Sequence, residues 1–205
     1  MAGSAARPRV GVLALQGDVR EHVRALQACG VGTCAVRRPE ELEHLDGLIL
    51  PGGESTTIIK LARAFDLLEP LRKRIADGLP TFGSCAGMIL LAERVDGLGS
   101  PLSETVGGID MTVRRNAFGR QVDSFEADVE MYGLTGGAVH AVFIRAPWVD
   151  SVGEAVTPLG HIRAGAGAGR IVAVRQQQLL ATSFHPELTG DTRIHGYFCD
   201  MVRAS

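Results

Sequence analysis

Residues 79–94 read LPTFGSCAGMILLAER and carry the strongest fold signal of the chain. The run at 79–82 is short and apolar, as in a buried strand, and the pattern at 86–94 is that of a helix. Between them, GSCAG at 83–87 is the thiol version of the nucleophile elbow of α/β enzymes. Its two glycines suit a sharp turn that brings backbone segments into contact. The stretch therefore predicts a cysteine presented at the carboxyl end of a sheet strand.

Strand and helix patterns also alternate toward the N-terminus. The continuous apolar run RVGVLAL at 9–15 is typical of a strand buried on both faces of a parallel sheet. We expect Asp18 to cap the helix that follows and Gly30 to end it. The other elements of this half are strands at 33–36 and 47–50 and a helical pattern at 56–76, which we expect Pro70 to interrupt. Such alternation is typical of a doubly wound parallel sheet.

The second half of the chain has a different pattern. Short apolar runs separated by turn residues predict strands at 109–113, 125–131, 139–144, 171–175 and 179–184. QQQ at 176–178 indicates a hairpin between the last two, and an amphipathic helix follows. AGAGAG at 164–169 is low in complexity and is expected to form a flexible turn. The chain is interpreted as a short tail at 1–8 and one domain at 9–203.

Composition narrows the classes of function. The 205 residues contain 21 Lys and Arg against 23 Asp and Glu, which gives a net charge of −2, and 5% are aromatic. We therefore expect neither a nucleic-acid partner nor an electrostatic role at a membrane surface. The N-terminus lacks the apolar core of a signal peptide, and no apolar run approaches the ~20 residues that span a bilayer. These features predict a cytoplasmic protein with reduced cysteines.

Four cysteines are present, and one of them has a catalytic context. They are too few and too scattered for a disulfide framework, and without a C-x-x-C motif no structural zinc site is expected. Cys85 differs from Cys29, Cys34 and Cys199 because it lies in the elbow, where the start of a helix lowers the pKa of a thiol. The alternative for Cys85 is a buried cysteine after a strand. The other three are interpreted as small core residues.

FHPE at 184–187 offers a base for this thiol at the end of the last predicted strand. Alternate residues of a strand point to the same side, so Glu187 can accept a hydrogen bond from the far ring nitrogen of His185. With Cys85 they form a candidate Cys-His-Glu triad. Taken alone, the pair is better interpreted as a surface ion pair. The remaining histidines have no evident partner or metal-ligand spacing and are interpreted as surface or core residues: His22, His44, His140, His161 and His195.

PGGEST at 51–56 is a third candidate element, again between a strand pattern and a helix pattern. Tandem glycines allow backbone N–H groups to point at an anion or at a developing oxyanion. No Lys follows them, so the sequence is not a Walker loop. The alternative is an ordinary strand-to-helix turn that is capped by Ser55.

Together, PGGES, GSCAG and FHPE resemble the class I, triad-type glutamine amidotransferases. More specifically, VGVLALQGDVREH at 10–22, RRNAFGRQ at 114–121 and VFIRAP at 142–147 are similar to the glutaminase subunits of pyridoxal 5′-phosphate synthase. This resemblance covers nearly the whole chain, with departures at 97–108 and 164–169. It implies an α/β, three-layer, flavodoxin-like fold with a mixed central sheet flanked by helices.

The resemblance also assigns residues. It implies Cys85 as the nucleophile, with His185 and Glu187 as its relay. It implies a site for L-glutamine made by Gly53, Glu54, Ser55, Arg115, Ile144 and Arg145. A guanidinium group suits the α-carboxylate of that substrate. Backbone N–H groups of Gly53 and Ala86 are the candidate oxyanion hole.

The implied reaction is hydrolysis of L-glutamine to glutamate and ammonia through a thioester, with no metal or organic cofactor. One domain leaves nothing to accept the ammonia, and the resemblance names the acceptor as the barrel-shaped subunit of pyridoxal 5′-phosphate synthase, in a hetero-oligomeric complex. A cysteine peptidase or thiol stress protein on a related α/β fold is the first rival, and testing glutamine against a peptide substrate separates it. A non-catalytic binding module is the second, although the presence of all three triad residues argues against it.

Overall fold

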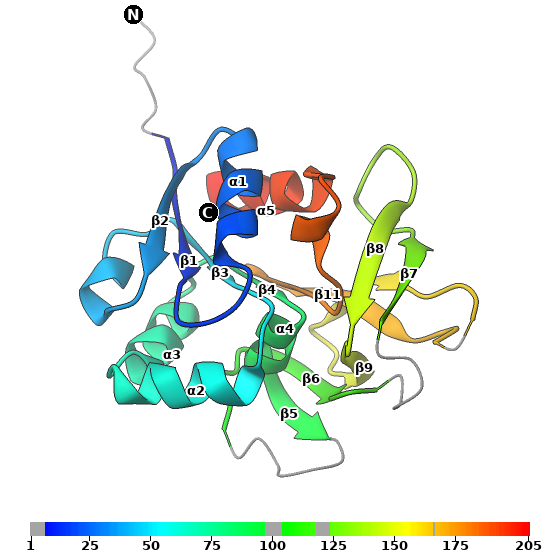
Figure 1. Cartoon of the computed structure of the whole chain (residues 1–205), viewed down its shortest axis with the longest axis horizontal. Coiled ribbons are helices and arrows are strands. Elements are labelled where there is room, and N and C mark those ends of the chain that lie inside the picture. Colours follow the sequence, from blue (N-terminus) through cyan, green and yellow to red (C-terminus); the bar gives the residue numbers. More distant parts are fainter. Residues whose placement is uncertain (1–6, 97–103, 118–123, 166) are drawn as a thin grey trace, which may run out of the picture.

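The computed structural model describes residues 7–96, 104–117, 124–165 and 167–205. Within these ranges, ten strands form a mixed central sheet with helices on both faces (Figure 1). The order along the sheet is β2-β1-β3-β4-β12-β11-β9-β6-β5, and β10 pairs with β11 outside this path. The prediction of a three-layer α/β fold with a mixed sheet is confirmed.

Half of the sheet is parallel. Its strands are β1 (Arg9–Leu13), β2 (Gly32–Val36), β3 (Gly47–Leu50), β4 (Thr81–Ser84) and β12 (Leu179–Thr182). Neighbouring strands in this half all run in the same direction. Every residue of β3, β4 and β12 is buried, because layers of side chains cover both faces of these strands.

The other half is mainly antiparallel. Its strands are β5 (Ala92–Asp96), β6 (Ile109–Arg114), β9 (Trp148–Val152), β10 (Thr157–His161) and β11 (Ile171–Gln176). The expected hairpin joins β11 to β12, and Gln177 at its tip has a positive φ of 51°. Strands β9 and β10 were not expected, because the polar residues and the proline in these segments hide the strand pattern.

Helices and a small hairpin form the outer layers. On one face lie α1 (Val19–Ala28), α5 (Arg193–Arg203) and the two-stranded sheet of β7 (Ser124–Val129) and β8 (Val139–Ile144). Their apolar side chains share one core cluster, which contains Leu26, Phe143 and Phe198 together with Phe82 of the central sheet. On the opposite face lie α2 (Ser55–Ala64), α3 (Leu68–Ala76) and α4 (Ala86–Leu91), which share the second cluster.

The helix expected at 86–94 is wrong in its second part. It ends at Leu91, and Ala92 has the extended conformation (φ −71°, ψ 140°) that begins β5. Pairing of β5 with β6 decides this, because it satisfies backbone groups that a longer helix would satisfy internally. The run MILL fits either element, so periodicity alone does not locate the boundary.

The helical pattern at 56–76 does form two helices, but Pro70 does not separate them. The break lies at Phe65–Leu67, where Asp66 has a positive φ of 55°. Pro70 is the third residue of α3, where a backbone N–H has no intrahelical partner to lose.

Some expectations fall on residues outside the described ranges: most of the N-terminal tail, 97–103 of the first departing loop, 118–121 of the RRNAFGRQ motif, and Ala166 of AGAGAG. The limits of a single domain at 9–203 stay a prediction. Of the helices that the structure describes, none combines the length and apolarity needed to cross a membrane.

Candidate active site

Cys85 lies at the junction of β4 and α4, at the carboxyl end of the parallel strands. Its backbone has a positive φ (φ 48°, ψ −100°), which is uncommon for a residue other than glycine. The flanking glycines are required by close backbone packing. A Cβ at Gly83 would lie 2.4 Å from the carbonyl oxygen of Gly87, and one at Gly87 would lie 2.0 Å from that of Leu50.

The thiol of Cys85 is covered. The residue is only 7% exposed. Its Sγ lies 3.9 Å from the carbonyl oxygen of Ile144, the last residue of β8. The small two-stranded sheet of β7 and β8 therefore supplies one wall of the site.

His185 follows β12, the strand beside β4 in the sheet. Its Nδ1 lies 2.7 Å from Oε1 of Glu187, and both side chains are buried. The strand ends at Thr182, and Glu187 belongs to the 3-10 helix η2 (Pro186–Leu188). The expectation that strand alternation aligns His185 with Glu187 is therefore wrong, because the tight turn that begins at Pro186 aligns them instead.

Asp18 takes part in this arrangement and does not cap α1. Its side chain makes no capping hydrogen bond, and its Oδ2 lies 3.4 Å from Nδ1 of His185. A carboxylate gains more from an imidazolium in a partly buried site than from a neutral backbone N–H at a helix start. Nδ1 of His185 thus faces two carboxylates.

The hydrogen bonds of His185 decide its protonation. Burial favours the neutral ring, but hydrogen bonds to Asp18, Cys85 and Glu187 outweigh it and raise the pKa of His185 to about 12. Burial raises the pKa of Glu187, and its hydrogen bond to His185 opposes that rise. At neutral pH the arrangement favours an imidazolium beside the thiol, which is the form that has a proton to give.

Asp18, His185 and Glu187 also bring potential ligand atoms within 4.8 Å of one another, so among the described residues they are the candidates to hold a cation. Both carboxylates face the same ring nitrogen, Nδ1. A proton on Nδ1 already makes the ring a cation beside both carboxylates, and a metal ion would have to displace that proton. The geometry supports a proton-sharing role, and we assign no metal to it.

Two further histidines lie behind Glu187. His22 of α1 is fully buried, and its Nε2 lies 3.0 Å from Oγ of Ser84 and 3.5 Å from Oε2 of Glu187. Its Nδ1 lies 3.0 Å from Nε2 of His195 in α5. The interpretation of His22 and His195 as core residues is confirmed, because both are fully buried, but the absence of an evident partner in the sequence was misleading. One signal was available, since Asp18 and His22 are four residues apart and therefore share a helix face.

The PGGEST turn packs directly against this cluster. A Cβ at Gly52 would lie 2.3 Å from Cε1 of His185, so this glycine is required by the approach of the ring. Gly53 is exposed and has a positive φ of 153°. The side-chain oxygen of Gln16 accepts a hydrogen bond from the N–H of Glu54 at 2.7 Å. The turn is therefore held on one side by His185 and on the other by Gln16.

Glu54 and Arg115, two of the residues expected to bind glutamine, contact each other. Nη2 of Arg115 lies 3.1 Å from Oε1 of Glu54. The carboxylate of Glu54 also accepts a hydrogen bond from the N–H of Thr56 and so caps α2. The alternative in which Ser55 is the cap is therefore wrong. Side by side, a carboxylate and a guanidinium offer complementary charges to the ammonium and carboxylate of an amino acid.

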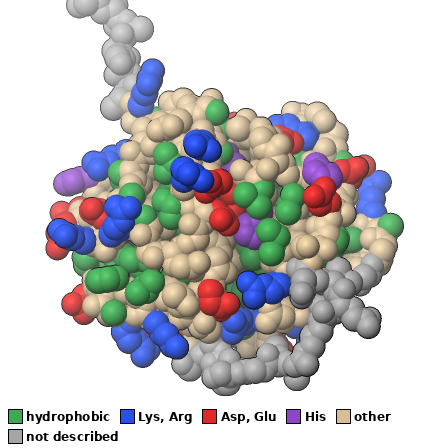
Figure 2. Space-filling model, in the orientation of Figure 1, with side chains coloured by type: hydrophobic (Ala, Val, Ile, Leu, Met, Phe, Trp, Pro, Cys, Tyr) green, Lys and Arg blue, Asp and Glu red, His purple; other side chains and the backbone are tan. Residues whose placement is uncertain are grey.

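The other expected residues lie around the same region. Ile144 is the last residue of β8 and Arg145 follows it; both are exposed, and Arg145 has a positive φ of 42°. Ala86 is the first residue of α4, so no carbonyl of its own helix can accept its N–H. In Figure 2, acidic, histidine and basic (Lys or Arg) side chains gather near the middle of the face that Figure 1 shows in ribbon form.

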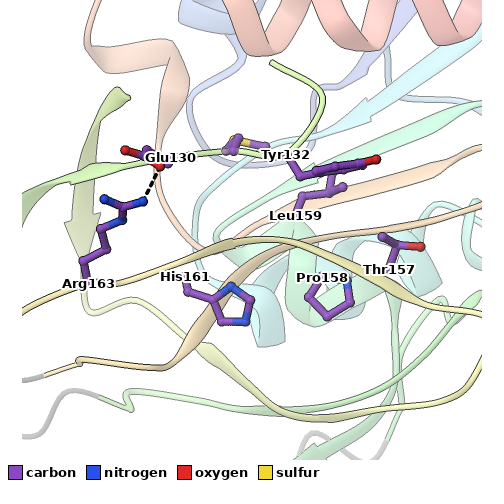
Figure 3. A pocket seen from close by; sticks show the side chains of 8 residues that line it. Glu130, Tyr132, Thr157, Pro158, Leu159, His161 and Arg163 are labelled. Atoms are coloured by element: carbon purple, nitrogen blue, oxygen red, sulfur yellow. Dashed lines mark hydrogen bonds and ion pairs between the residues drawn. The ribbon is translucent and has the colours of Figure 1, made fainter. Parts of the chain in front are cut away.

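A separate pocket of about 630 Å³ lies between residues 130–132 and β10 (Figure 3). An ion pair between Arg163 and Glu130 lies at one end of it. Its lining consists of Glu130, Met131, Tyr132, Thr157, Pro158, Leu159, His161 and Arg163. None of the expected site residues belongs to it, so it lends no support to a glutamine site.

Similarity to known proteins extends over nearly the whole chain. The sequence profile of the SNO glutamine amidotransferase family matches residues 12–204. A relative from Salinispora arenicola, named pyridoxal 5′-phosphate synthase subunit PdxT, is 63% identical over 97% of this chain and 98% of its own length. A protein of the same name from Nocardia farcinica is 63% identical over 97% of this chain and 88% of its own.

Solved structures agree with this assignment. A crystal structure described as a glutamine amidotransferase is 49% identical, has a TM-score of 0.85, and covers 95% of this chain and 98% of that one. The structure of PurLQS from Thermotoga maritima is 16% identical with a TM-score of 0.67, covers 97% of this chain and 96% of that one, and shares the fold. On the strength of the near-complete family match and of these relatives, the chain belongs to the SNO glutamine amidotransferase family.

Proposed function

We propose that this chain hydrolyses L-glutamine to L-glutamate and ammonia as the glutaminase subunit of a pyridoxal 5′-phosphate synthase. The observation that carries the proposal is the position of His185. Although burial favours the neutral ring, hydrogen bonds to Asp18, Cys85 and Glu187 raise its pKa to about 12. Family membership and the name shared by the relatives support the same conclusion.

The proposed reaction uses a thiol nucleophile. The Sγ thiolate of Cys85 attacks the side-chain amide carbon of glutamine, and the carbonyl oxygen becomes an oxyanion. The imidazolium of His185 donates its proton to the amide nitrogen, which leaves as ammonia, and a γ-glutamyl thioester remains. Water then adds to the thioester with His185 as base, and glutamate and the thiol are released. Glu187 stabilises the imidazolium without transferring a proton itself.

Substrate binding follows from the charges around the thiol. Arg115 pairs with the α-carboxylate of glutamine, and Glu54, which it contacts at 3.1 Å, pairs with the ammonium group. The backbone of Ile144, whose carbonyl faces Sγ, and the neighbouring Arg145 form the β8 side of the site. Backbone N–H groups of Gly53 and Ala86 bind the oxyanion, and the loss of one such donor typically costs 10²–10³-fold in rate.

The ammonia is passed to a separate barrel-shaped synthase subunit in a hetero-oligomeric complex. The isolated chain is then expected to be a poor glutaminase that this partner activates. Gly53 offers a route, because it is exposed and glycine changes peptide orientation with little steric cost. A partner that binds the orientation with the Gly53 N–H toward the oxyanion raises its population. Equal glutaminase rates with and without saturating synthase subunit would exclude this activation and leave the triad untouched.

The test is the Cys85→Ala variant, assayed for ammonia release in the presence of the synthase subunit. We expect no hydrolysis above background, together with native folding and unchanged partner binding. Cys34→Ala is the matched control, because that cysteine is half-buried in β2, away from the elbow. Ammonia release by Cys85→Ala would refute the proposal. Cleavage of peptides but not of glutamine by the wild type would favour a cysteine peptidase instead.

A further inference from the structure

A buried chain of polar side chains extends behind Glu187. It runs from His195 in α5 through His22 in α1 to Glu187 in η2, with Ser84 of β4 beside His22. Four separate elements contribute to it, and all four side chains are buried. Burial of polar groups costs stability unless they are paired, so an arrangement of this kind calls for a physical explanation.

The carboxylate of Glu187 uses its two oxygens differently. Oε1 accepts the hydrogen bond of His185, whereas Oε2 is buried and, among the described residues, has no partner at hydrogen-bond distance. The polar atom that faces Oε2 is Nε2 of His22, 3.5 Å away. Glu187 thus lies between two imidazole rings, one that faces the thiol and one that faces the interior.

The hydrogen bonds define which nitrogen of His22 carries the proton. A bare Nε2 would place the negative end of the ring dipole 3.5 Å from Oε2 of Glu187, which is repulsive. With the proton on Nε2, the N–H donates to Oγ of Ser84 at 3.0 Å with its positive end near Oε2, and Nδ1 accepts from the Nε2–H of His195. This leaves Nδ1 of His195 as a bare, unpaired acceptor. If His22 instead donated from Nδ1 to Nε2 of His195, Nδ1 of His195 would carry a buried N–H without a partner. A buried donor without a partner is rarer in proteins than a buried acceptor without one.

The surroundings keep both inner rings neutral. Phe82 meets the edges of His22 and His195 with ring centroids 6.1 and 5.9 Å away. Burial, then His195 and His185, lower the pKa of His22 well below its usual value, and burial lowers the pKa of His195 to about 4. A neutral His22 presents a fixed N–H dipole to Glu187 and does not compete with His185 as a second cation.

We propose that His22 is a positioning residue of glutamine hydrolysis: its Nε2–H, fixed by Ser84, directs the positive end of its dipole at Oε2 of Glu187 from 3.5 Å, so that the carboxylate stays ionised with Oε1 aimed at His185. The inference rests on the proposed function, since it requires that Glu187 supports His185 during the reaction. His195 fixes the tautomer of His22 and acts one step further away.

Loss of the His22 N–H is expected to change how the rate of glutamine hydrolysis depends on pH. The ionisable groups around Glu187 are His185 and Asp18 on the active-site side and His22 with His195 on the inner side, and Cys85 lies beyond His185. Burial and the charge of Asp18 raise the pKa of Glu187, and the hydrogen bond and charge of His185 oppose that rise. In the proposal, the N–H dipole of His22, 3.5 Å from Oε2, acts in the same direction as His185. Without that N–H, Glu187 takes up a proton at higher pH, and His185 then loses its acceptor.

The experiment measures kcat and KM for glutamine between pH 5.5 and 9, with the full chain and saturating synthase subunit. His22→Phe fills the space of the ring without a donor, and His22→Gln restores an N–H donor. For His22→Phe we expect the midpoint of the acid limb of the kcat/KM profile to shift to higher pH by about one unit. At neutral pH we expect kcat to fall by roughly tenfold, with KM little changed. His22→Gln should recover most of both. His140→Gln, an exposed histidine of β8, is the control and should leave the profile unchanged.

Two results would overturn the inference. One is a folded His22→Phe variant whose acid limb coincides with that of the wild type. The other comes from the unaltered protein by nitrogen NMR of the histidine rings, where we expect His22 to be neutral with its proton on Nε2 from pH 6 to 8. A proton on Nδ1, or a charged ring in that range, would contradict the hydrogen-bond direction. Failure of the wild type to hydrolyse glutamine would instead refute the proposed function.

Discussion

The strands in the two halves of the central sheet differ in how deeply they are buried. In the parallel half, β3, β4 and β12 are buried at every residue, and the backbones around the elbow are in direct contact. In the other half, β6 alternates between buried and more exposed residues, and β8 of the separate two-stranded sheet alternates in the same way. The groups proposed for chemistry follow the buried strands, whereas β8 supplies a carbonyl and the rim. Rigid packing positions the reacting atoms, and the more exposed half shapes access to them.

The largest loss of activity is expected at the carboxyl ends of β4 and β12, the neighbouring buried strands that precede Cys85 and His185. His185→Asn removes the base of the thiol and the proton donor of the leaving nitrogen, so glutamine hydrolysis should fall by about 10⁶-fold. Glu187→Gln should cost less, about 10⁴-fold, because Glu187 orients the ring and transfers no proton. Ammonia release with saturating synthase subunit measures both variants. Equal and small losses would mean that FHPE is only a strand end.

The next prediction compares the stability of variants at two glycines: Gly87, which packs against the parallel half, and Gly160, which lies in the other half. At Gly87 of α4 an added methyl group meets the backbone oxygen of Leu50 at 2.0 Å, which cannot yield without moving β3. Gly87→Ala should therefore lower the free energy of unfolding by about 3 kcal/mol. At Gly160 of β10 the nearest atom is a side-chain carbon of Val129 at 3.0 Å, and Gly160→Ala should cost about 1 kcal/mol or less. Urea unfolding of both variants tests the difference, and equal costs would remove this distinction between the halves.

A smaller effect concerns pH and the inner histidines. The pKa of His195 is lowered to about 4 in the folded protein by burial, whereas an unfolded histidine titrates near 6.5. Between these values the unfolded chain binds more protons, so this contribution to stability is present above pH 6.5 and is lost as the pH falls toward 4. From pH 7 to pH 5 the loss from His195 alone is about 2 kcal/mol.

The variant His195→Phe isolates this effect, because titration of all other groups affects both proteins. Its unfolding free energy should decrease less than that of the wild type between pH 7 and pH 5, by about 2 kcal/mol. Parallel pH curves for the two proteins would show that His195 does not titrate differently on folding.

The smallest effect is expected at the pocket in the more exposed half. Arg163 and Glu130 form an ion pair whose side chains are 68% and 57% exposed. Arg163→Ala should change the free energy of unfolding by less than about 0.5 kcal/mol, since exposed pairs are screened by water and salt. It should also leave glutaminase activity unchanged. A large loss of activity would show that the pocket belongs to the functional surface. Groups needed for activity would then not be confined to the buried parallel half and its surroundings.

The amino-acid sequence by itself determined the parallel half and the local motifs. Apolar runs such as 47–50 are long enough and isolated enough to have one interpretation, and the expected strand there matches β3. GSCAG and FHPE are equally local, because a tight turn and a neighbouring histidine and glutamate are fixed by adjacent residues. The nucleophile and its relay could therefore be proposed from the residue pattern and the family resemblance.

Only the tertiary structure decided the contacts between distant segments. Ala92–Asp96 became a strand because β6 was available to pair with it, and no periodicity in MILLAER encodes that partner. His22 and His195 are 173 residues apart, and their hydrogen bond exists because α1 and α5 pack on the same face of the sheet. Local sequence fixes which groups are present and how each turn bends. The distances that give a buried carboxylate its neighbours arise only when separate elements pack together.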